Sequence, residues 1–421
     1  MPASRRAGQE AYPTMKILAL NGGSSSFKAS LFELAGSPPA AAPPPLWDAR
    51  VDFKHHEGSA EIRIAAADGA PLHQTIAVAS PLAALEPLLA MLWSGAARAV
   101  ADRAEIAAIG HRIVHGGKAF RQSTRISPDV MAAIARLASF APEHNRLEVE
   151  AIEEAERIFG PATPQVAVFD TAFHATLPPA AYVYPGPYDW LAEGTRRYGF
   201  HGISHQYVSR RAAEILGRDL HSLRMIACHL GSGCSLAAIS GGESVDTTMG
   251  FTPLEGLMMG TRSGSIDPGI LIHLVRHCGY RAEDLDRVLN QESGLKGLSG
   301  ISGDMRDILS AMAAGHERAR LAFDVYVHRL CASIGAMTAS LRGLDALVFT
   351  AGVGENCAPL RAAACETLAF LGMKIDPVKN DHAAEGDADI AAADSAIRIV
   401  VVRTQEEWEI AKECARVLTG G

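Results

Sequence analysis

Two arginines set among glycines are the residues of this sequence best suited to chemistry on an anion. Arg112 lies in an apolar run that ends in two glycines, and Arg262 lies between Gly260 and Gly264. A guanidinium group can hold a carboxylate or a phosphoryl group in transfer through two parallel hydrogen bonds. The alternative is an ordinary ion pair for each arginine, because the chain has 47 acidic residues. The local sequence leaves both interpretations open.

Asp170 and His201 are the next candidates for chemistry. Asp170 closes the apolar run 165–170, and ligands of open α/β sheets bind at the carboxyl ends of strands. It could equally cap a helix, since Thr171 and a turn follow it. His201 stands in a loop bracketed by glycines. An imidazole placed there can donate a hydrogen bond to charge that develops in a transition state.

Glu406 and Asn21 together form a candidate metal site. Glu406 starts the last predicted helix, where a carboxylate also interacts favourably with the helix N-terminus without any metal. As a metal ligand it needs a partner such as Asn21. Hard oxygen ligands of this kind suit Mg²⁺.

Turns rich in glycine and serine are the elements that would position these side chains. The stretch 16–32 predicts a strand, a turn at 21–26 and a second strand that carries Lys28. Adjacent glycines let the backbone approach a ligand closely, and neighbouring hydroxyls add small donors. The turn matches neither a Walker A loop nor the dinucleotide fingerprint. The pattern recurs at 225–242 and, without the return strand, at 347–356, which predicts two related halves closing on one phosphorylated ligand.

The composition indicates a soluble globular protein of two domains. The chain has 421 residues, of which 48% are hydrophobic and 20% charged, and its net charge of −8 argues against a nucleic-acid surface. Seven scattered cysteines without CxxC pairs predict reduced thiols in a cytosolic protein. No apolar run approaches the roughly 20 residues that span a bilayer. Residues 1–14 are expected to form a disordered leader, with Met15 as an alternative start.

Hydrophobic periodicity and turn residues predict the remaining elements. Residues 36–46, rich in Pro and Ala, predict a surface connection. Residues 244–268 predict a long, ordered and functional loop, and 171–201 predict a domain boundary. The other predicted elements are strands at 106–117, 165–170 and 397–403, helices at 81–99, 128–139, 146–159, 202–216 and 406–418, and a helical region over 269–342 interrupted at 294–304.

Motifs along nearly the whole chain after residue 14 resemble those of the acetate and propionate kinase family. This family belongs to the larger group of sugar kinases, actin and the Hsp70 ATPase. The match over 246–264 is the longest and most specific. The matching segments are Asn21 to Ser26 with Lys28, Gly110 to Gly117, Val168 to His174, Tyr198 to Gly202, Asp246 to Gly264, Ala351 to Asn356 and Thr404 to Glu407.

The resemblance implies an enzyme that phosphorylates acetate with ATP, giving acetyl phosphate and ADP by reversible, direct in-line transfer. It implies an α/β fold of two actin-like ATPase (ribonuclease H-like) domains, each a mixed sheet flanked by helices, with the active site in the cleft between them. The N-terminal acetate-kinase domain is expected at 15–172 plus 406–421, and the C-terminal nucleotide-binding domain at 173–405. The implied cofactor is Mg²⁺, with Mn²⁺ as an alternative. A cytoplasmic homodimer without nucleic-acid or membrane partners is expected.

The resemblance also assigns roles to individual residues. Asp170 is the implied active-site acid, Arg262 and His201 would stabilise the transition state, and Asn21 and Glu406 would hold the metal. The implied substrate-binding residues are Arg112, Val114, Phe200, Pro253 and Glu143. The implied ATP-binding residues are Lys28, His229, Leu230, Gly231, Ser232, Gly233, Asp304, Met305, Arg306, Gly352, Val353, Gly354, Glu355 and Asn356.

Four positions depart from the family pattern. Ser232 replaces an Asn of the second glycine turn, and Met305 replaces a Phe of the nucleoside segment. Ser265 replaces an Asp that could orient Arg262. The largest departure is Glu143, which replaces a Leu of the apolar pocket for the substrate methyl group.

Glu143 raises the question of which acid this chain prefers. Burying an unpaired carboxylate costs roughly several kcal/mol. Glu143 is therefore expected to turn to solvent, to pair with Arg146 or to contact a polar substrate group. One alternative to acetate is another short carboxylate, such as propionate, butyrate or a polar acid. A second alternative, suggested by Ser232 and Ser265, is a nucleotide-binding protein with weakened catalysis.

Overall fold

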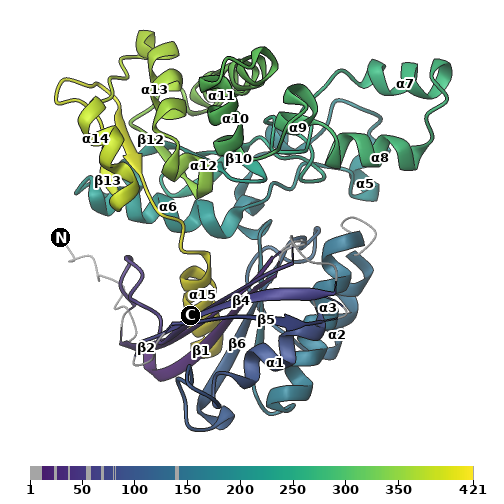
Figure 1. Cartoon of the computed structure of the whole chain (residues 1–421), viewed down its shortest axis with the longest axis vertical. Helices are drawn as coiled ribbons and strands as arrows, with labels where there is room; N and C mark the ends of the chain where they lie inside the picture. The colour runs from purple at the N-terminus through teal and green to yellow at the C-terminus, as the bar shows by residue number, and fades with distance from the viewer. Residues whose placement is uncertain are drawn as a thin grey trace, which may run out of the picture. The chain divides into compact units, whose positions relative to one another are not determined.

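The structure is a computed structural model of the chain. It describes residues 12–22, 26–36, 38–53, 58–67, 71–78, 80, 82–137 and 142–420, without the side chains of 12, 13 and 142–145. The chain divides into two compact units, the first made of residues 1–172 and 405–421 and the second of residues 173–404 (Figure 1). Residues 1–11 of the predicted leader lie outside the described residues. Residues 12–14 were assigned to that leader wrongly, because they belong to strand β1.

The first unit contains an eight-stranded mixed sheet in the order β5-β4-β3-β2-β1-β6-β8-β7. Strands β1, β6 and β8 are parallel, and the other neighbours are antiparallel. The predicted hairpin is present, with Asn21 opposite Lys28, although turn residues 23–25 are not described. The strands are β1 (Tyr12–Gly22), β2 (Ser26–Gly36), β3 (Trp47–Asp52), β4 (Ser59–Ala66), β5 (Leu72–Ala77), β6 (Ile106–Ile113), β7 (Thr124–Arg125) and β8 (Gln165–Phe169).

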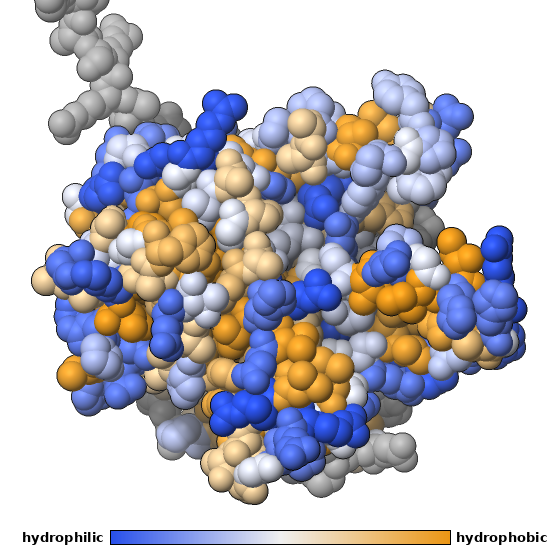
Figure 2. All heavy atoms as spheres, turned by 90° about the horizontal axis from the view of Figure 1, so that it is seen from above, coloured by the Kyte–Doolittle hydropathy of each residue, from blue (hydrophilic) through white to orange (hydrophobic). Residues whose placement is uncertain are grey.

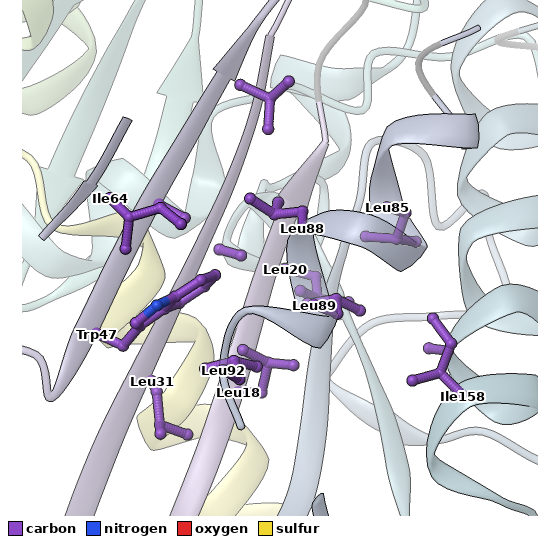
Figure 3. Packing of buried hydrophobic residues seen from close by; sticks show 14 of the residues in the cluster. Leu18, Leu20, Leu31, Trp47, Ile64, Leu85, Leu88, Leu89, Leu92 and Ile158 are labelled. Carbon is purple, nitrogen blue, oxygen red and sulfur yellow. The ribbon is translucent and has the colours of Figure 1, made fainter. Parts of the chain in front are cut away.

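Helices cover both faces of this sheet. On one face Leu18, Leu20 and Trp47 pack against α1 and α3 (Figure 3). Alternate residues of a strand point to the opposite face, where Phe32 contacts Trp408 of α15 with ring centroids 5.2 Å apart. The helical segments are η1 (Leu82–Ala84), α1 (Leu85–Ala90), η2 (Arg103–Glu105), α2 (Pro128–Arg136), α3 (Pro142–Phe159) and α15 (Glu406–Thr419).

Gly110 explains how closely α15 approaches the sheet. A Cβ atom at Gly110 would lie 2.6 Å from a side-chain carbon of Ile410. Only glycine leaves room for the helix there. This packing returns the end of the chain to the first unit and places the N-terminus of α15 at the ends of β1 and β6 (Figure 1).

The second unit contains a six-stranded mixed sheet in the order β11-β10-β9-β12-β14-β13. Strands β9, β12 and β14 are parallel, and β10, β11 and β13 are antiparallel to their neighbours. The strands are β9 (Arg224–Leu230), β10 (Cys234–Ser240), β11 (Glu243–Thr247), β12 (Ala346–Thr350), β13 (Ala388–Asp389) and β14 (Arg398–Val401).

Helices make up most of the rest of the second unit. The long helix α11 packs against β9, β10 and α9, and α6 packs against β9 and β12. The segments are η4 (Ala172–Thr176), α4 (Pro179–Tyr182), α5 (Asp189–Glu193), α6 (Gly202–Ile215), η5 (Leu220–Ser222), α7 (Pro268–His277), α8 (Ala282–Gln291), α9 (Gly294–Ser299), α10 (Met305–Ala313), α11 (Glu317–Leu341), α12 (Ala351–Asn356), α13 (Ala358–Thr367), η6 (Ala369–Leu371), α14 (Pro377–His382) and η7 (Ala383–Glu385).

Three sequence predictions of elements are corrected. The helix predicted at 81–99 is only η1 followed by α1, and it ends well before Gly95, whose φ of +79° does not suit a helix. The loop predicted at 244–268 begins inside strand β11. The interruption predicted at 294–304 contains helix α9. Gly294 is needed there, since a Cβ would lie 2.2 Å from the Met259 carbonyl oxygen.

The surface of the chain is mixed in polarity. Figure 2 shows apolar side chains on one face gathered in separate patches with hydrophilic residues between them. Three exposed large apolar residues, Ile270, Ile272 and Val275, share helix α7. Within the described residues, none of the helices has the length and apolar character needed to cross a membrane.

Candidate functional site

In the first unit, Arg112 and Asp170 meet at the carboxyl ends of two parallel strands. Arg112 lies near the end of β6 and Asp170 directly follows β8, its neighbour in the sheet. The Nε and Nη2 atoms of Arg112 donate to Oδ2 of Asp170 at 3.0 and 2.6 Å. Burial opposes the charge, but the carboxylates of Asp170 and Glu406 raise the pKa of Arg112 above its ordinary value. Arg112 is therefore a permanent cation at this sheet edge.

Asn21 joins the same cluster from β1. Its Nδ2 donates to Oε2 of Glu406 and to Oε1 of Glu407, both at 2.9 Å. Its Oδ1 accepts a hydrogen bond from Nη1 of Arg112 at 3.4 Å. Both glutamates lie in the first turn of α15. The structure thus brings Asn21, Arg112, Asp170 and Glu406 together, as the sequence predicted for a metal and carboxylate site, and each comes from a different element.

The donors of this cluster fit Mg²⁺. This ion prefers oxygen ligands and is usually held by one or two protein carboxylates, with water and phosphate completing its shell. Glu406 offers a carboxylate and Asn21 an amide oxygen, and their side chains already touch. Across the part of the chain that the structure describes, no three His, Cys, Asp or Glu side chains form a metal-binding group. A closed, all-protein metal cage therefore does not explain these residues, whereas a sparse Mg²⁺ site does.

Lys28 faces the same helix end. It stands opposite Asn21 on β2, and its Nζ lies 3.3 Å from Oε1 of Glu407. Attraction to Glu407 raises the pKa of Lys28 above its ordinary value. Glu407 therefore contacts both Asn21, a predicted metal ligand, and Lys28, a predicted phosphate ligand. Sequence reasoning quoted Glu407 in a motif but gave it no role.

In the second unit, His201 and Arg262 converge on the second glycine turn. A Cβ atom at Gly233 would lie 3.4 Å from Nε2 of His201 and 3.4 Å from Nη1 of Arg262. Nη1 of Arg262 also donates to the carbonyl oxygen of Pro253 at 3.3 Å. The ring of His201 stacks on that of His229, with centroids 4.1 Å apart and an angle of 18° between the planes. Two donors that the sequence predicted for phosphoryl oxygens therefore flank one glycine.

Backbone contacts connect this turn to the other predicted nucleotide segments. A Cβ at Gly231 would lie 3.7 Å from Cβ of Ala351, so β12 ends and α12 begins beside the turn. The Gly260 amide donates to the Ser232 carbonyl at 3.3 Å. A Cβ at Gly303 would lie 2.9 Å from the Gly260 carbonyl oxygen, which brings in the start of α10. Glycine is required at 260 and 303, because a side chain at either position would separate these two segments.

Other predicted ATP-binding residues lie at or near the starts of helices α10 and α12. Asp304 caps α10 by accepting from the Arg306 amide at 2.9 Å, and its carboxylate also pairs with the Arg306 guanidinium. Oε1 of Glu355 accepts from the amides of Ala351 and Thr404, at 2.7 and 3.0 Å. Leu230 ends β9 and Met305 starts α10, both buried. Val353, Gly354 and Asn356 lie with Gly352 in α12.

The structure describes only some of the side chains predicted to bind the substrate. Val114 is buried in the first unit, and its amide donates to Oε1 of Glu148 at 3.0 Å. Phe200 is buried in the second unit, where its carbonyl oxygen accepts from His174. Pro253 contacts Arg262 as described above. The Glu143 side chain lies outside the described residues, and the prediction about it stays open.

Comparison with known proteins identifies the family. A model described as "Acetokinase family" matches residues 16–412. The chain belongs to the acetokinase family. It is 58% identical over 401 residues to the acetate kinase of Gloeobacter violaceus, covering 95% of this chain and 98% of that one. It is 55% identical over 405 residues to the acetate kinase of Nostoc punctiforme, covering 96% and 100%.

Two solved structures show the same fold at lower identity. The acetate kinase of Porphyromonas gingivalis superposes with a TM-score of 0.86 at 38% identity, covering 96% of this chain and all of the other. A propionate kinase from Francisella tularensis superposes with a TM-score of 0.85 at 37% identity, covering 95% and 98%. The predicted family and fold class are confirmed: the chain has the α/β fold of two actin-like ATPase domains found in acetokinases.

Glu148 of this acetokinase is a buried carboxyl group that sequence reasoning missed. It lies within α3 among several other glutamates, so nothing in the pattern singles it out. One oxygen accepts from the Val114 amide, and Oε2 is buried without a hydrogen-bond partner among the residues that the structure describes. Burial raises the pKa of Glu148 to about 8, despite the nearby Arg112. The side chain is therefore mostly protonated in the folded chain at pH 7.

From the raised pKa of Glu148 we expect the free energy of unfolding to fall as pH rises. Between about pH 4.5 and 8 the folded state holds a proton that the unfolded state has released, so the free energy of unfolding decreases across this window. Glu148→Gln, which resembles the protonated carboxyl, should remove this slope, a difference of about 3–4 kcal/mol between pH 5 and 8. Urea unfolding at several pH values measures it. Glu150→Gln, on the same helix but partly exposed, should leave the slope unchanged. Equal slopes in wild type and Glu148→Gln would contradict the prediction.

Proposed function

We propose that this chain transfers the γ-phosphoryl group of ATP to acetate, giving acetyl phosphate and ADP. The observation that supports this most directly is the cluster of Arg112, Asp170, Asn21 and Glu406 at one sheet edge of an acetokinase-family chain. The cluster combines a buried cation, suited to a carboxylate, with oxygen ligands suited to Mg²⁺. Relatives that cover nearly their whole length are named acetate kinase.

The proposed reaction needs positioning and charge more than proton transfer. An acetate oxygen attacks the γ-phosphorus, and the bond from that phosphorus to the bridging oxygen of ADP breaks. Because acetate is already ionised at pH 7, no strong general base is required. Arg112 would hold the carboxylate, and His201 and Arg262 would donate to the equatorial phosphoryl oxygens. Bound Mg²⁺, held by Asn21 and Glu406, would neutralise phosphate charge.

Acyl-phosphate formation tests the proposal. Purified chain is incubated with ATP, Mg²⁺ and one acid at a time, and hydroxylamine traps the product as a coloured hydroxamate. Acetate should give a higher kcat/KM than propionate, butyrate, glycolate or glycine. ATP binding without an acyl phosphate from any acid would overturn the proposal in favour of a nucleotide-binding protein. A clear preference for another acid would retain the chemistry and change the substrate.

Glu143 supplies the specific prediction for substrate choice. If its carboxylate lies in the methyl pocket, Glu143→Leu should lower KM for acetate, by about tenfold for the loss of one desolvated charge. The same kcat and KM in both proteins would show that Glu143 does not affect the pocket. The propionate kinase of Francisella tularensis, at 37% identity, makes propionate the comparison acid of choice.

The oligomeric state and location belong to the same proposal. We propose a homodimer, and the exposed apolar residues Ile270, Ile272 and Val275 of α7 support a protein contact there. Sedimentation of the wild type and of Ile272→Lys would test it, because a monomeric wild type excludes the dimer. A cytoplasmic location is proposed from the seven free cysteines, six of them buried.

A further inference from the structure

Behind His201 lies a second histidine that the proposed reaction does not use. His205 follows His201 by one turn at the start of α6, where the His205 amide donates to the His201 carbonyl at 2.9 Å. His205 is fully buried. His201 itself has a φ of 56°, an uncommon backbone conformation for a residue other than glycine. The fold therefore holds His201 in an uncommon backbone conformation, one helical turn before a buried imidazole.

A serine hydroxyl joins the two rings. Oγ of Ser235, in β10, lies 2.9 Å from Nδ1 of His201 and 2.8 Å from Nε2 of His205. Ser235 is fully buried as well. A hydroxyl has one proton to donate and can accept from other donors. Only one of the two rings can therefore accept a hydrogen bond from Ser235, and the other must donate to it.

The surroundings of His205 determine which of the two rings donates to Ser235. Its other ring nitrogen, Nδ1, is buried, and no described residue forms a hydrogen bond with it. Burial, with the neighbouring histidines, lowers the pKa of His205 well below its ordinary value, so the ring is neutral and carries one proton. A buried N–H without an acceptor is rarer in proteins than an acceptor without a donor. The His205 proton therefore belongs on Nε2, where it is donated to Ser235.

We propose that His205 and Ser235 are positioning residues that fix the tautomer of His201, with its proton on Nε2. Ser235 accepts from His205 and donates to Nδ1 of His201, which leaves Nδ1 as an acceptor. Nε2 is the atom that lies, with Nη1 of Arg262, beside Gly233. The chain thus presents a neutral N–H donor and a guanidinium to the same point. This inference rests on the proposed function only for its kinetic consequence.

The arrangement also disfavours a charged His201. An imidazolium carries a proton on Nδ1 as well, so the Ser235 oxygen would accept from both rings and its own proton would lose His201 as an acceptor. His201 is therefore kept as a hydrogen-bond donor that does not lose its proton to the phosphoryl group. The positive charge beside Gly233 comes from Arg262.

Ring ¹⁵N NMR of the full chain tests the proposal without any reaction. The chain is labelled with [¹⁵N]histidine, and His201 is assigned from the signals missing in His201→Asn. Nδ1 of His201 should show the shift of an unprotonated nitrogen and Nε2 that of a protonated one near pH 7. A proton on Nδ1, or on both nitrogens, overturns the proposal. This readout stands even if no acid is phosphorylated, so the proposal and the proposed function fail separately.

Matched variants distinguish the relay from a merely structural role. Ser235→Ala and His205→Leu should give mixed His201 tautomers and lower kcat about 10- to 100-fold, with KM for ATP within about threefold. His205→Gln, whose amide can donate from the position of Nε2, should restore the tautomer and most of kcat. Circular dichroism checks that each variant folds. A His205→Leu variant with the wild-type tautomer and kcat, or a His205→Gln variant as impaired as His205→Leu, overturns the relay.

Discussion

Arg262→Ala is expected to lower kcat for acetyl phosphate formation by about 10³-fold, the loss seen when a donor to transition-state charge is removed. The reason is placement: Nη1 of Arg262 lies beside Gly233 together with Nε2 of His201. KM for ATP and acetate should change little, because the contact strengthens mainly in the transition state. Steady-state kinetics in the hydroxamate assay measures both quantities.

Controls for Arg262 separate charge from geometry. Arg262→Lys keeps the positive charge without the planar fork, and it should recover only part of kcat. Arg276→Ala removes an exposed arginine of α7 in the same unit and should leave kcat unchanged. Arg262 is partly exposed in a loop, so its alanine variant should unfold at nearly the wild-type urea concentration. A kcat within threefold of wild type for Arg262→Ala would remove this residue from the mechanism.

Arg112→Ala is expected to reduce both activity and stability. Loss of the guanidinium should lower kcat/KM for acetate by about 10³-fold, as the carboxylate loses its cation. It should also cost about 3–5 kcal/mol of stability, because Asp170, only 1% exposed, then loses its charged partner. Hydroxamate kinetics and urea unfolding measure the two effects.

A second substitution separates these two consequences of losing Arg112. Adding Asp170→Asn to Arg112→Ala removes the buried charge and should recover most of the stability but none of the activity. Arg125→Ala, at an exposed arginine of the same sheet, is the matched control and should change neither. If Arg112→Ala kept the wild-type kcat/KM for acetate, Arg112 would not bind the substrate.

The helices and strands were predictable wherever the chain repeats a simple period. The apolar run of β8 and the amphipathic α15 lie close to their predicted positions. The errors fall where tertiary contacts override local preference. α9 forms in a glycine-rich stretch because Gly294 lets the chain pass the Met259 carbonyl, while Leu295 is buried. Local periodicity carries no information about such a contact.

The sequence by itself determined the residue types and the family. The glycine turns, the two arginines and the long motif at 246–264 were sufficient to predict an acetokinase, which the comparisons confirm. The positions of residues within these motifs also indicated Asn21, Asp170, His201 and Glu406 as candidate site residues. These assignments depend on which residue types stand at the positions of each motif, and the sequence gives the residue types directly.

The tertiary structure alone decided which groups support those candidates and in what state. Glu407 contacts Asn21 because α15 packs against the sheet of the first unit. The two residues are 386 positions apart in the sequence. Glu148 is protonated, and His205 neutral, because the fold removes both from water. Burial and long-range hydrogen bonds arise only when distant segments pack. A glutamate or histidine in the sequence therefore does not reveal its charge, its tautomer or its partner.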